Sequence, residues 1–184
     1  ANVDNQFEGR DWIVARFNTN GTLDTSFNST GFVTRGFAQN EDIINKVVLL
    51  LDGKILVLGT SANSANGTVT IVGRFNPNGS VDIPFGPYGD GYFDVYDGGS
   101  LSRKLIVKPD GKILIAGDFV IVFPPSRLVV VQYNNNGTLD TGFGNQGASV
   151  GNYPYGEDLF DASLTADGKI VLLAFSAYEP PGTR

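Results

Sequence analysis

Two short motifs recur together three times along the chain and fill most of its 184 residues. The first motif centres on an Asn-Gly turn, and its copies are RFNTNGTLDTSF from Arg16, RFNPNGSVDIPFG from Arg74 and QYNNNGTLDTGFG from Gln132. The second centres on Asp-Gly-Lys, and its copies are LLDGKILVLGT from Leu50, KPDGKILIAGD from Lys108 and TADGKIVLLAF from Thr165. Successive copies lie 57 or 58 residues apart. Periods of this length are typical of repeat folds, in which each repeat adds one supersecondary unit.

Each repeat is expected to consist of β-strands. The Asp-Gly pairs lie between apolar runs, which predicts hairpins with two-residue type I′ turns, because Gly adopts positive φ freely and Asp tolerates it. The predicted hairpin strands are Val47–Leu51 with Ile55–Leu58, Leu105–Val107 with Ile113–Ala116, and Leu164 with Ile170–Ala174. Further strands are predicted at Trp12–Asn18, Val69–Asn76 and Leu128–Asn134, and weaker ones at Phe32–Arg35, Tyr92–Tyr96 and Ala148–Gly151. No segment keeps a 3.6-residue apolar period, so no helix is expected.

Four antiparallel strands per repeat predict an all-β fold made of β-propeller blades, because radial packing of small sheets hides most strand edges. A β-solenoid or a string of sandwiches is the alternative, although solenoid coils are usually shorter. We expect a single β-propeller segment over residues 1–184, with repeat units at about 12–67, 68–126 and 127–176. Closed propellers have about four to eight blades, so three repeats are expected to form a partial ring. Either a longer chain or a second copy would complete it, and the absence of methionine favours the longer chain.

The paired motifs resemble the delta-60 repeat, a repeat of bacterial secreted and surface proteins. The resemblance covers about 165 residues in three copies. The third copy departs from it, with Gln132-Tyr133 in place of Arg-Phe and Phe175 where a glycine is usual, and Asn28 replaces a glycine in the first copy. The resemblance implies a β-propeller fold and an extracellular or cell-surface location in a bacterium. It implies no catalytic residues.

The composition excludes several classes of function. The chain contains no cysteine and no histidine, which removes thiol nucleophiles, disulfides, imidazole bases and the usual zinc or haem ligands. Its formal net charge of −6 disfavours nucleic acid, because that binding depends on neutralising phosphates with basic residues. The longest apolar run is far shorter than the ~20 residues of a membrane-spanning helix. We therefore expect neither an enzyme nor a nucleic-acid-binding or membrane-inserted protein.

Some residues recur at the same place in every repeat and are expected to be structural. The pairs Leu23/Phe27, Val81/Phe85 and Leu139/Phe143 are expected to anchor the core. The aspartates Asp24, Asp82 and Asp140 are expected to be buried and to fix the long connection by accepting backbone N–H groups. The lysines Lys54, Lys112 and Lys169 are expected to be solvated charges at strand edges.

Residues that do not recur are the better candidates for a ligand site, because loops vary while the scaffold persists. The segment from Phe85 to Ser100 combines tyrosines with carboxylates, a pairing suited to carbohydrate, since rings stack on sugar C–H groups and carboxylates accept hydroxyl hydrogens. The candidate ligand-binding residues are Tyr88, Asp90, Tyr92, Asp94, Tyr96, Asp97, Tyr153 and Tyr155. Packing of the tyrosines between blades is the alternative. Ca²⁺ could bind the same acids, but the twelve-residue calcium loop is missing, so no metal site is assigned and no cofactor is expected.

The segment Phe119–Arg127 is longer and more apolar than its counterpart in the first repeat, Ser61–Gly67. It is expected either to extend a hairpin or to dock a partner protein. The candidate docking residues are Phe119, Val120, Ile121, Val122 and Phe123. The leading hypothesis is a non-catalytic propeller segment that acts as a structural or protein-interaction scaffold, and the alternative is a carbohydrate-binding lectin or adhesin.

Overall fold

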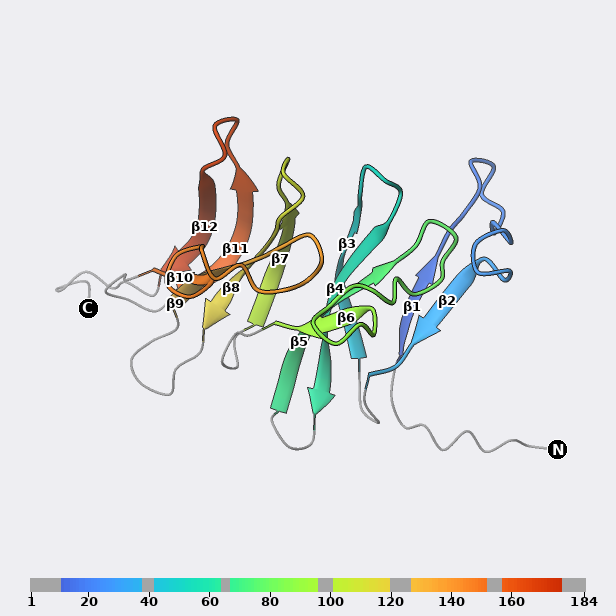
Figure 1. The fold of residues 1–184 in the computed structure, drawn as a ribbon, viewed down its shortest axis with the longest axis horizontal. Helices are drawn as coiled ribbons and strands as arrows, with labels where there is room; N and C mark the ends of the chain where they lie inside the picture. The colour runs from blue at the N-terminus through green and yellow to red at the C-terminus, as the bar shows by residue number, and fades with distance from the viewer. Residues whose placement is uncertain are drawn as a thin grey trace, which may run out of the picture. The chain divides into compact units, whose positions relative to one another are not determined.

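The computed structural model describes residues 11–37, 42–63, 67–95, 101–119, 127–151 and 157–176. These residues form twelve β-strands and no helix, which confirms the predicted all-β fold (Figure 1). The chain divides into two compact units, Ala1–Asp94 and Val95–Arg184, and each is described by itself. No helix in the described part of the chain is long and apolar enough to cross a membrane.

The first unit contains a two-stranded and a four-stranded antiparallel sheet. The two-stranded sheet pairs β1 (Trp12–Ala15) with β2 (Phe32–Arg35). The four-stranded sheet has the order β3-β4-β5-β6. Its strands are β3 (Asp42–Leu49), β4 (Ile55–Asn63), β5 (Gly67–Phe75) and β6 (Tyr92–Asp94).

The second unit contains the same two kinds of sheet in the opposite order along the chain. Its four-stranded sheet has the order β10-β9-β8-β7, and a two-stranded sheet of β11 and β12 follows. The strands are β7 (Leu101–Val107), β8 (Ile113–Phe119), β9 (Arg127–Tyr133), β10 (Ala148–Val150), β11 (Glu157–Leu164) and β12 (Ile170–Ser176).

The four-stranded sheets are out of phase with the sequence repeats. A repeat that starts at the strand before an Asn-Gly turn contributes the last two strands of one sheet and the first two of the next. By repeat position, β1 and β2 therefore correspond to β5 and β6, and β11 and β12 correspond to β3 and β4. We call the β1–β2 sheet and the β11–β12 sheet the two half-sheets.

The hairpin turns differ from the predicted type. A type I′ turn needs positive φ at both central residues. In the first of these turns only Gly53 has positive φ, at 82°. The Gly53 N–H donates to the Leu50 carbonyl, and Leu50 N–H donates to the Lys54 carbonyl, which makes a three-residue loop with a glycine bulge. The Asp52 carboxylate accepts the Lys54 N–H at 3.0 Å, so Asp serves this turn without positive φ.

Each unit has a core between its half-sheet and its four-stranded sheet. In the first unit Trp12, 1% exposed, packs with Val57, Ile71 and Phe75. A Cβ at Gly59 would lie 2.5 Å from the Trp12 ring, so the glycine makes room for the indole. In the second unit the buried residues are Leu114, Ala116, Leu128, Val130 and Leu159.

The expected core anchors are only partly confirmed. Phe27 and Phe85 are fully buried, whereas Phe143 is half-buried and Leu23 is 37% exposed.

Candidate functional site

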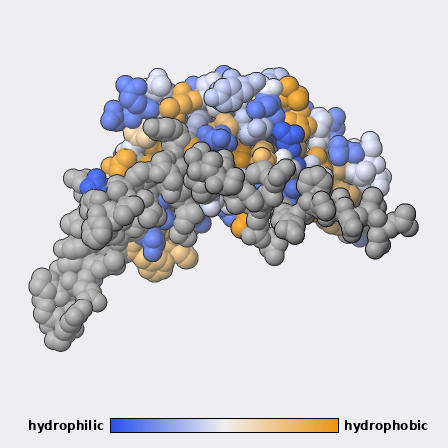
Figure 2. Space-filling model, turned by 90° about the horizontal axis from the view of Figure 1, so that it is seen from below, coloured by the Kyte–Doolittle hydropathy of each residue, from blue (hydrophilic) through white to orange (hydrophobic). Residues whose placement is uncertain are grey.

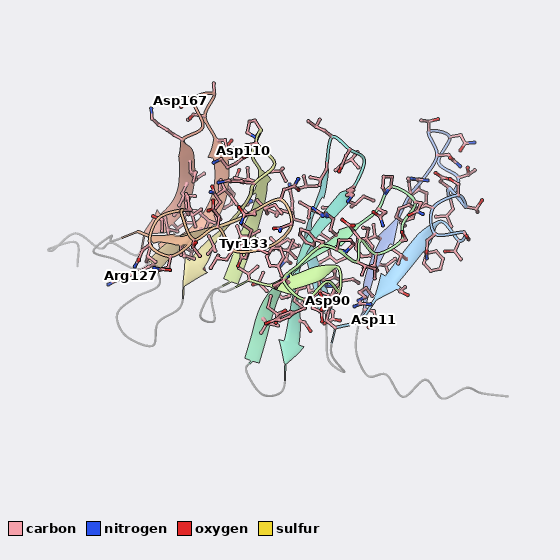
Figure 3. All side chains as sticks on the ribbon, viewed as in Figure 1. Asp11, Asp90, Asp110, Arg127, Tyr133 and Asp167 are labelled. Atoms are coloured by element: carbon pink, nitrogen blue, oxygen red, sulfur yellow. The ribbon has the colours of Figure 1, made fainter. Side chains whose placement is uncertain are left out.

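The Tyr/Asp-rich segment around β6 is divided by the structure into exposed and packed residues. Tyr88 is 88% exposed, and Asp94 is also exposed. Asp90 and Tyr92 are half-buried. Figure 3 labels Asp90 near the chain's β6 and Asp11 beside the β1–β2 half-sheet. The other four candidates, Tyr96, Asp97, Tyr153 and Tyr155, lie outside the described residues.

Tyr92 belongs to an aromatic stack within the first unit. Its ring meets Phe37 edge-on at 4.9 Å between centroids, and Phe37 meets Trp12 at 4.5 Å. The Arg35 guanidinium lies 5.6 Å from the centroids of both Phe37 and Tyr92. Edge-on contacts and a covering cation are favourable packing for aromatic rings, and they occupy surface that a sugar would need. Tyr88 is thus the exposed aromatic candidate among the described residues.

The charges around Tyr92 are close enough to shift its titration. Burial raises the pKa of the Tyr92 hydroxyl, and the carboxylates of Asp90 and Asp94 raise it further. Burial also raises the pKa of Asp94, with a contribution from the negative charge of Asp90. One carboxylate oxygen of Asp90, Oδ1, is buried and has no hydrogen-bond partner among the described residues. Asp90 and Asp94 are therefore neighbouring acceptors, and Tyr88 precedes Asp90 by two residues in the sequence.

No group of three or more Asp, Glu, His or Cys side chains that could hold a metal gathers among the residues that the structure describes. The sequence left calcium binding by the acids near β6 possible without assigning a site, and the described residues offer no ligand set for it.

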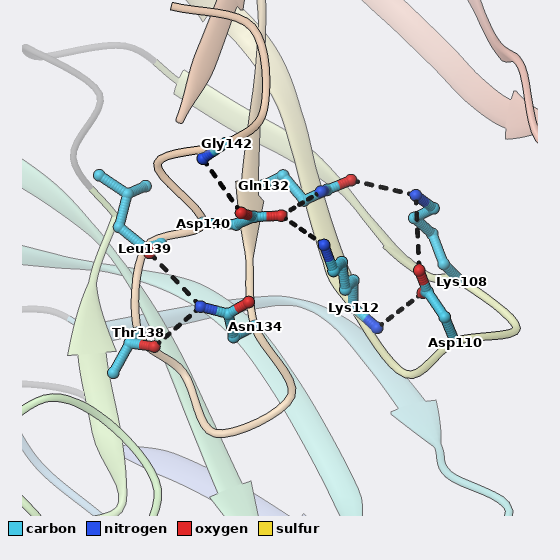
Figure 4. A network of polar contacts seen from close by, with 9 residues as sticks. All are labelled: Lys108, Asp110, Lys112, Gln132, Asn134, Thr138, Leu139, Asp140 and Gly142. Carbon is cyan, nitrogen blue, oxygen red and sulfur yellow. Dashed lines mark hydrogen bonds and ion pairs between the residues drawn. The ribbon is translucent and has the colours of Figure 1, made fainter. Parts of the chain in front are cut away.

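A carboxylate clamp occurs at the same place in the two four-stranded sheets. In the first four-stranded sheet the buried Asp82 Oδ2 accepts from Arg74 Nε at 2.6 Å and from Lys54 Nζ at 2.9 Å. In the second, Asp140 Oδ2 accepts from Gln132 Nε2 at 2.6 Å and Lys112 Nζ at 2.7 Å (Figure 4). In both sheets the clamp connects the segment after the Asn-Gly turn to the hairpin turn two strands earlier in the sequence.

The clamp corrects the interpretation of the lysines. Lys54 and Lys112 were expected to be solvated, but each forms an ion pair with the aspartate 28 residues later in the sequence, because the hairpin turn lies beside the connection. The prediction holds for Lys169, which is 79% exposed. The aspartates were expected to be buried, which holds for Asp82, whereas Asp24 and Asp140 are half-buried. As expected, Asp24 accepts the Ser26 N–H and Asp140 accepts the Gly142 N–H. Sequence reasoning missed the cations, although their constant spacing from the aspartates was a usable signal.

The half-sheets leave strand edges open. Among the described residues, β1 pairs only with β2, and β12 pairs only with β11. The large apolar side chains exposed on these two strands or next to them are Ile13, Phe17, Val171, Leu173 and Phe175. On the face of the molecule seen in Figure 2, apolar and polar side chains of the described residues are interspersed.

The proposed docking loop is described only at its base. Phe119 is the last residue of β8 and pairs with Arg127 at the start of β9. Val120, Ile121, Val122 and Phe123 lie outside the described residues, so the choice between an extended hairpin and a docking surface stays open.

The repeated sheets and clamps agree with a comparison against family models. Residues 3–27, 50–82 and 108–143 match the family described as "Domain of unknown function (DUF5122) beta-propeller", and together they make up just over half of the chain. The chain belongs to this β-propeller family. All three matched segments contain motif residues, and the last two contain the lysine and the aspartate of one clamp each. The finer delta-60 resemblance stays a prediction. No curated protein and no solved structure matches the chain significantly.

Proposed function

We propose that this DUF5122 propeller segment is a non-catalytic scaffold that binds other proteins through the open strand edges of its half-sheets. The observation that carries the proposal is that β1 and β12 each have an edge with no partner strand among the described residues, and that both strands bear exposed apolar side chains. Such edges accept an added strand through main-chain hydrogen bonds, with side-chain contacts supplying specificity. The location implied by the delta-60 resemblance, outside or on the surface of a bacterial cell, belongs to the same proposal.

The chemistry of the described side chains supports a non-catalytic role. The aspartates that recur in the repeats are engaged in turns and clamps, for example Asp52 with the Lys54 amide and Asp82 with two cations. The chain has no histidine or cysteine to activate a serine or threonine hydroxyl. The groups available for binding are instead the main-chain hydrogen-bonding groups at the strand edges and the exposed apolar side chains.

Strand capture at β12 can be tested with a proline variant. The Thr165 N–H donates to the Lys169 carbonyl across the hairpin, so by alternation the amide of Ala174 points away from β11 toward the open edge. Ala174→Pro removes that donor and is expected to abolish binding of a labelled peptide of alternating threonine and valine, measured by fluorescence anisotropy. Ala174→Thr keeps the N–H and should bind like the parent. Equal binding by the proline variant would contradict edge capture.

A second candidate function is carbohydrate binding at Tyr88. The observations that favour it are the 88% exposure of the Tyr88 ring and the exposed carboxylate of Asp94 six residues later. The ring would stack on a sugar face while the carboxylate of Asp94 accepts its hydroxyl hydrogens.

We expect Tyr88→Ala to remove any signal that the parent gives on a glycan array, because the stacking surface would be lost. Ile83→Ala is the matched control, since it also removes an exposed side chain of this loop, 59% exposed, but no aromatic ring. Binding that survives Tyr88→Ala would exclude this site.

A further inference from the structure

By repeat position, the two half-sheets correspond to the two complementary halves of one four-stranded sheet. In the complete sheets the halves are joined by the central pairs β4–β5 and β8–β9. Those pairs share one register: Ile55 is opposite Phe75, and Ile113 is opposite Tyr133. The same repeat positions are Ile170 on β12 and Phe17 just after β1. In this register Leu173 would lie opposite Val14.

The apolar side chains exposed on the half-sheets are buried at the equivalent positions of complete sheets. Ile13 is 59% exposed, whereas its equivalents Ile71 and Val129 are 2% and 6% exposed. On β12, Leu173 is 57% exposed, whereas Leu58 and Ala116 are 0% and 2% exposed. The half-sheets therefore expose surface that the complete sheets bury.

The equivalent residues Phe17, just after β1, and Phe75, at the end of β5, differ in the same way. Phe17 is 63% exposed, whereas Phe75 is 3% exposed. An added strand that completes the sheet would bury such side chains, which is the favourable term in most protein association.

The clamp residues of the half-sheets are also complementary. Complete sheets pair the hairpin lysine with the aspartate 28 residues later, as Lys54 does with Asp82. Within the part of the chain that the structure describes, Asp24 forms an ion pair with Arg16 at 2.7 Å but with no lysine, and Lys169 forms an ion pair with its neighbour Asp167 at 2.5 Å. The β11–β12 half-sheet thus carries a lysine, Lys169, at the repeat position from which complete sheets contact the aspartate. The β1–β2 half-sheet carries the matching aspartate, Asp24.

We propose that β12 of one copy pairs antiparallel with β1 of a second copy, so that β11-β12-β1-β2 forms one composite sheet closed by an ion pair between Lys169 and Asp24. This inference rests on the proposed strand-edge function and names the partner that the edge takes. We call the junction between β12 and β1 the seam. The strand register, the exposed apolar side chains and the charged residues are all complementary there, which an arbitrary strand would not provide. With the sheets that the structure describes, pairing of β12 with β1 of the same chain would close a ring of three sheets, fewer than the four or more of known propellers.

Cysteine cross-linking tests the seam directly, because the chain contains no cysteine of its own. One chain carries Val14→Cys and the other Leu173→Cys, positions that would face each other across the seam on one side of the sheet. Mixing the two under mild oxidation is expected to give a disulfide-linked species near twice the mass of one chain. Ile13→Cys mixed with Leu173→Cys is the control, because neighbouring side chains of a strand point to opposite faces and should not cross-link.

Light scattering and ultracentrifugation on the unmodified chain supply the second readout. We expect a dimer or a larger head-to-tail assembly, and Lys169→Ala should weaken association by about tenfold, the effect of a close charge pair across an interface. The exposed Lys46→Ala should leave association unchanged.

A folded monomer without the mixed cross-link would overturn the composite sheet. If that monomer still binds the alternating peptide, the scaffold proposal stands and only the choice of partner fails. A single chain can also carry both Val14→Cys and Leu173→Cys. A disulfide within that chain, together with the mass of a monomer, would likewise overturn the composite sheet.

Discussion

Asp82→Asn should lower the free energy of unfolding by about 3 kcal/mol, because it leaves Arg74 and Lys54 without the carboxylate that neutralises them. The Asp82 side chain is 6% exposed and that of Arg74 is 9% exposed, so water cannot replace the lost partner well. The Arg74 guanidinium also lies 4.1 Å from the centroid of the buried Phe85 ring, which fixes its position. Chemical denaturation followed by circular dichroism measures the loss.

Asp140→Asn is the matched control for the clamp. Gln132 stands where Arg74 stands in the earlier repeat, so Asp140 has one cation, Lys112, and its side chain is 15% exposed. The variant should lose clearly less stability than Asp82→Asn. Equal losses would mean that the aspartate acts through the backbone of the connection and not through the buried charges.

The same clamp gives the Asp82 contribution a definite pH dependence. Burial alone would raise the pKa of Asp82, but the hydrogen bonds and charges of Lys54 and Arg74 lower it overall below its usual 3.8. A carboxyl whose pKa is lower in the folded state contributes fully above the unfolded value and loses that contribution as the pH falls through the folded value. The difference in stability between the parent and Asp82→Asn should therefore shrink in acid below about pH 4.

Trp12→Ala should cost about 3–5 kcal/mol, because it removes the largest buried side chain between the β1–β2 half-sheet and the β3–β6 sheet. The cavity would adjoin Gly59, Gly73 and Phe37, and neither glycine has a side chain to fill it. We expect the half-sheet to come loose before the four-stranded sheet unfolds. Amide hydrogen exchange would show this as lost protection in β1 and β2 while β4 and β5 remain protected.

Trp12→Phe separates packing from hydrogen bonding at this position. The Trp12 Nε1 is buried and has no hydrogen-bond partner among the described residues, so removing it should cost little. The phenylalanine variant should keep most of the stability that the alanine variant loses. Losses of the same size in both would point to a role for the indole N–H.

The sequence predicted the strands well because its signals were local. The apolar runs beside Asp-Gly and Asn-Gly turns led to strands at the expected places, and Phe32–Arg35 has the expected bounds. In contrast, β11 begins at Glu157, seven residues before Leu164, the one residue of it that was expected. The predicted turn type was wrong. Asp-Gly is favoured both in a two-residue type I′ turn and in a three-residue loop with a glycine bulge, and only the backbone φ angles of Asp52 and Gly53 distinguish the two. The sequence also did not show which strands of successive repeats share a sheet, because a repeating pattern does not mark which strand of a sheet comes first.

The candidate site was less accessible to sequence reasoning for a different reason. Tyr88 and Tyr92 have the same chemistry and lie four residues apart, yet one is exposed and the other packs on Phe37 under Arg35. Phe37 and Trp12 are far from Tyr92 in the sequence, so nothing local distinguishes the two tyrosines. The Lys54–Asp82 clamp is similarly non-local, and only comparison between repeats could have suggested it.

The offset between repeats and sheets bears on how such a chain can change length during evolution. A duplication of one 58-residue period, cut anywhere, would add one complete four-stranded sheet and leave both flanking half-sheets with their original strands. Each new sheet would bring its own lysine and aspartate to the clamp. Arrays of different size could therefore arise by copying whole periods, without a compensating change in the strands that must match one another.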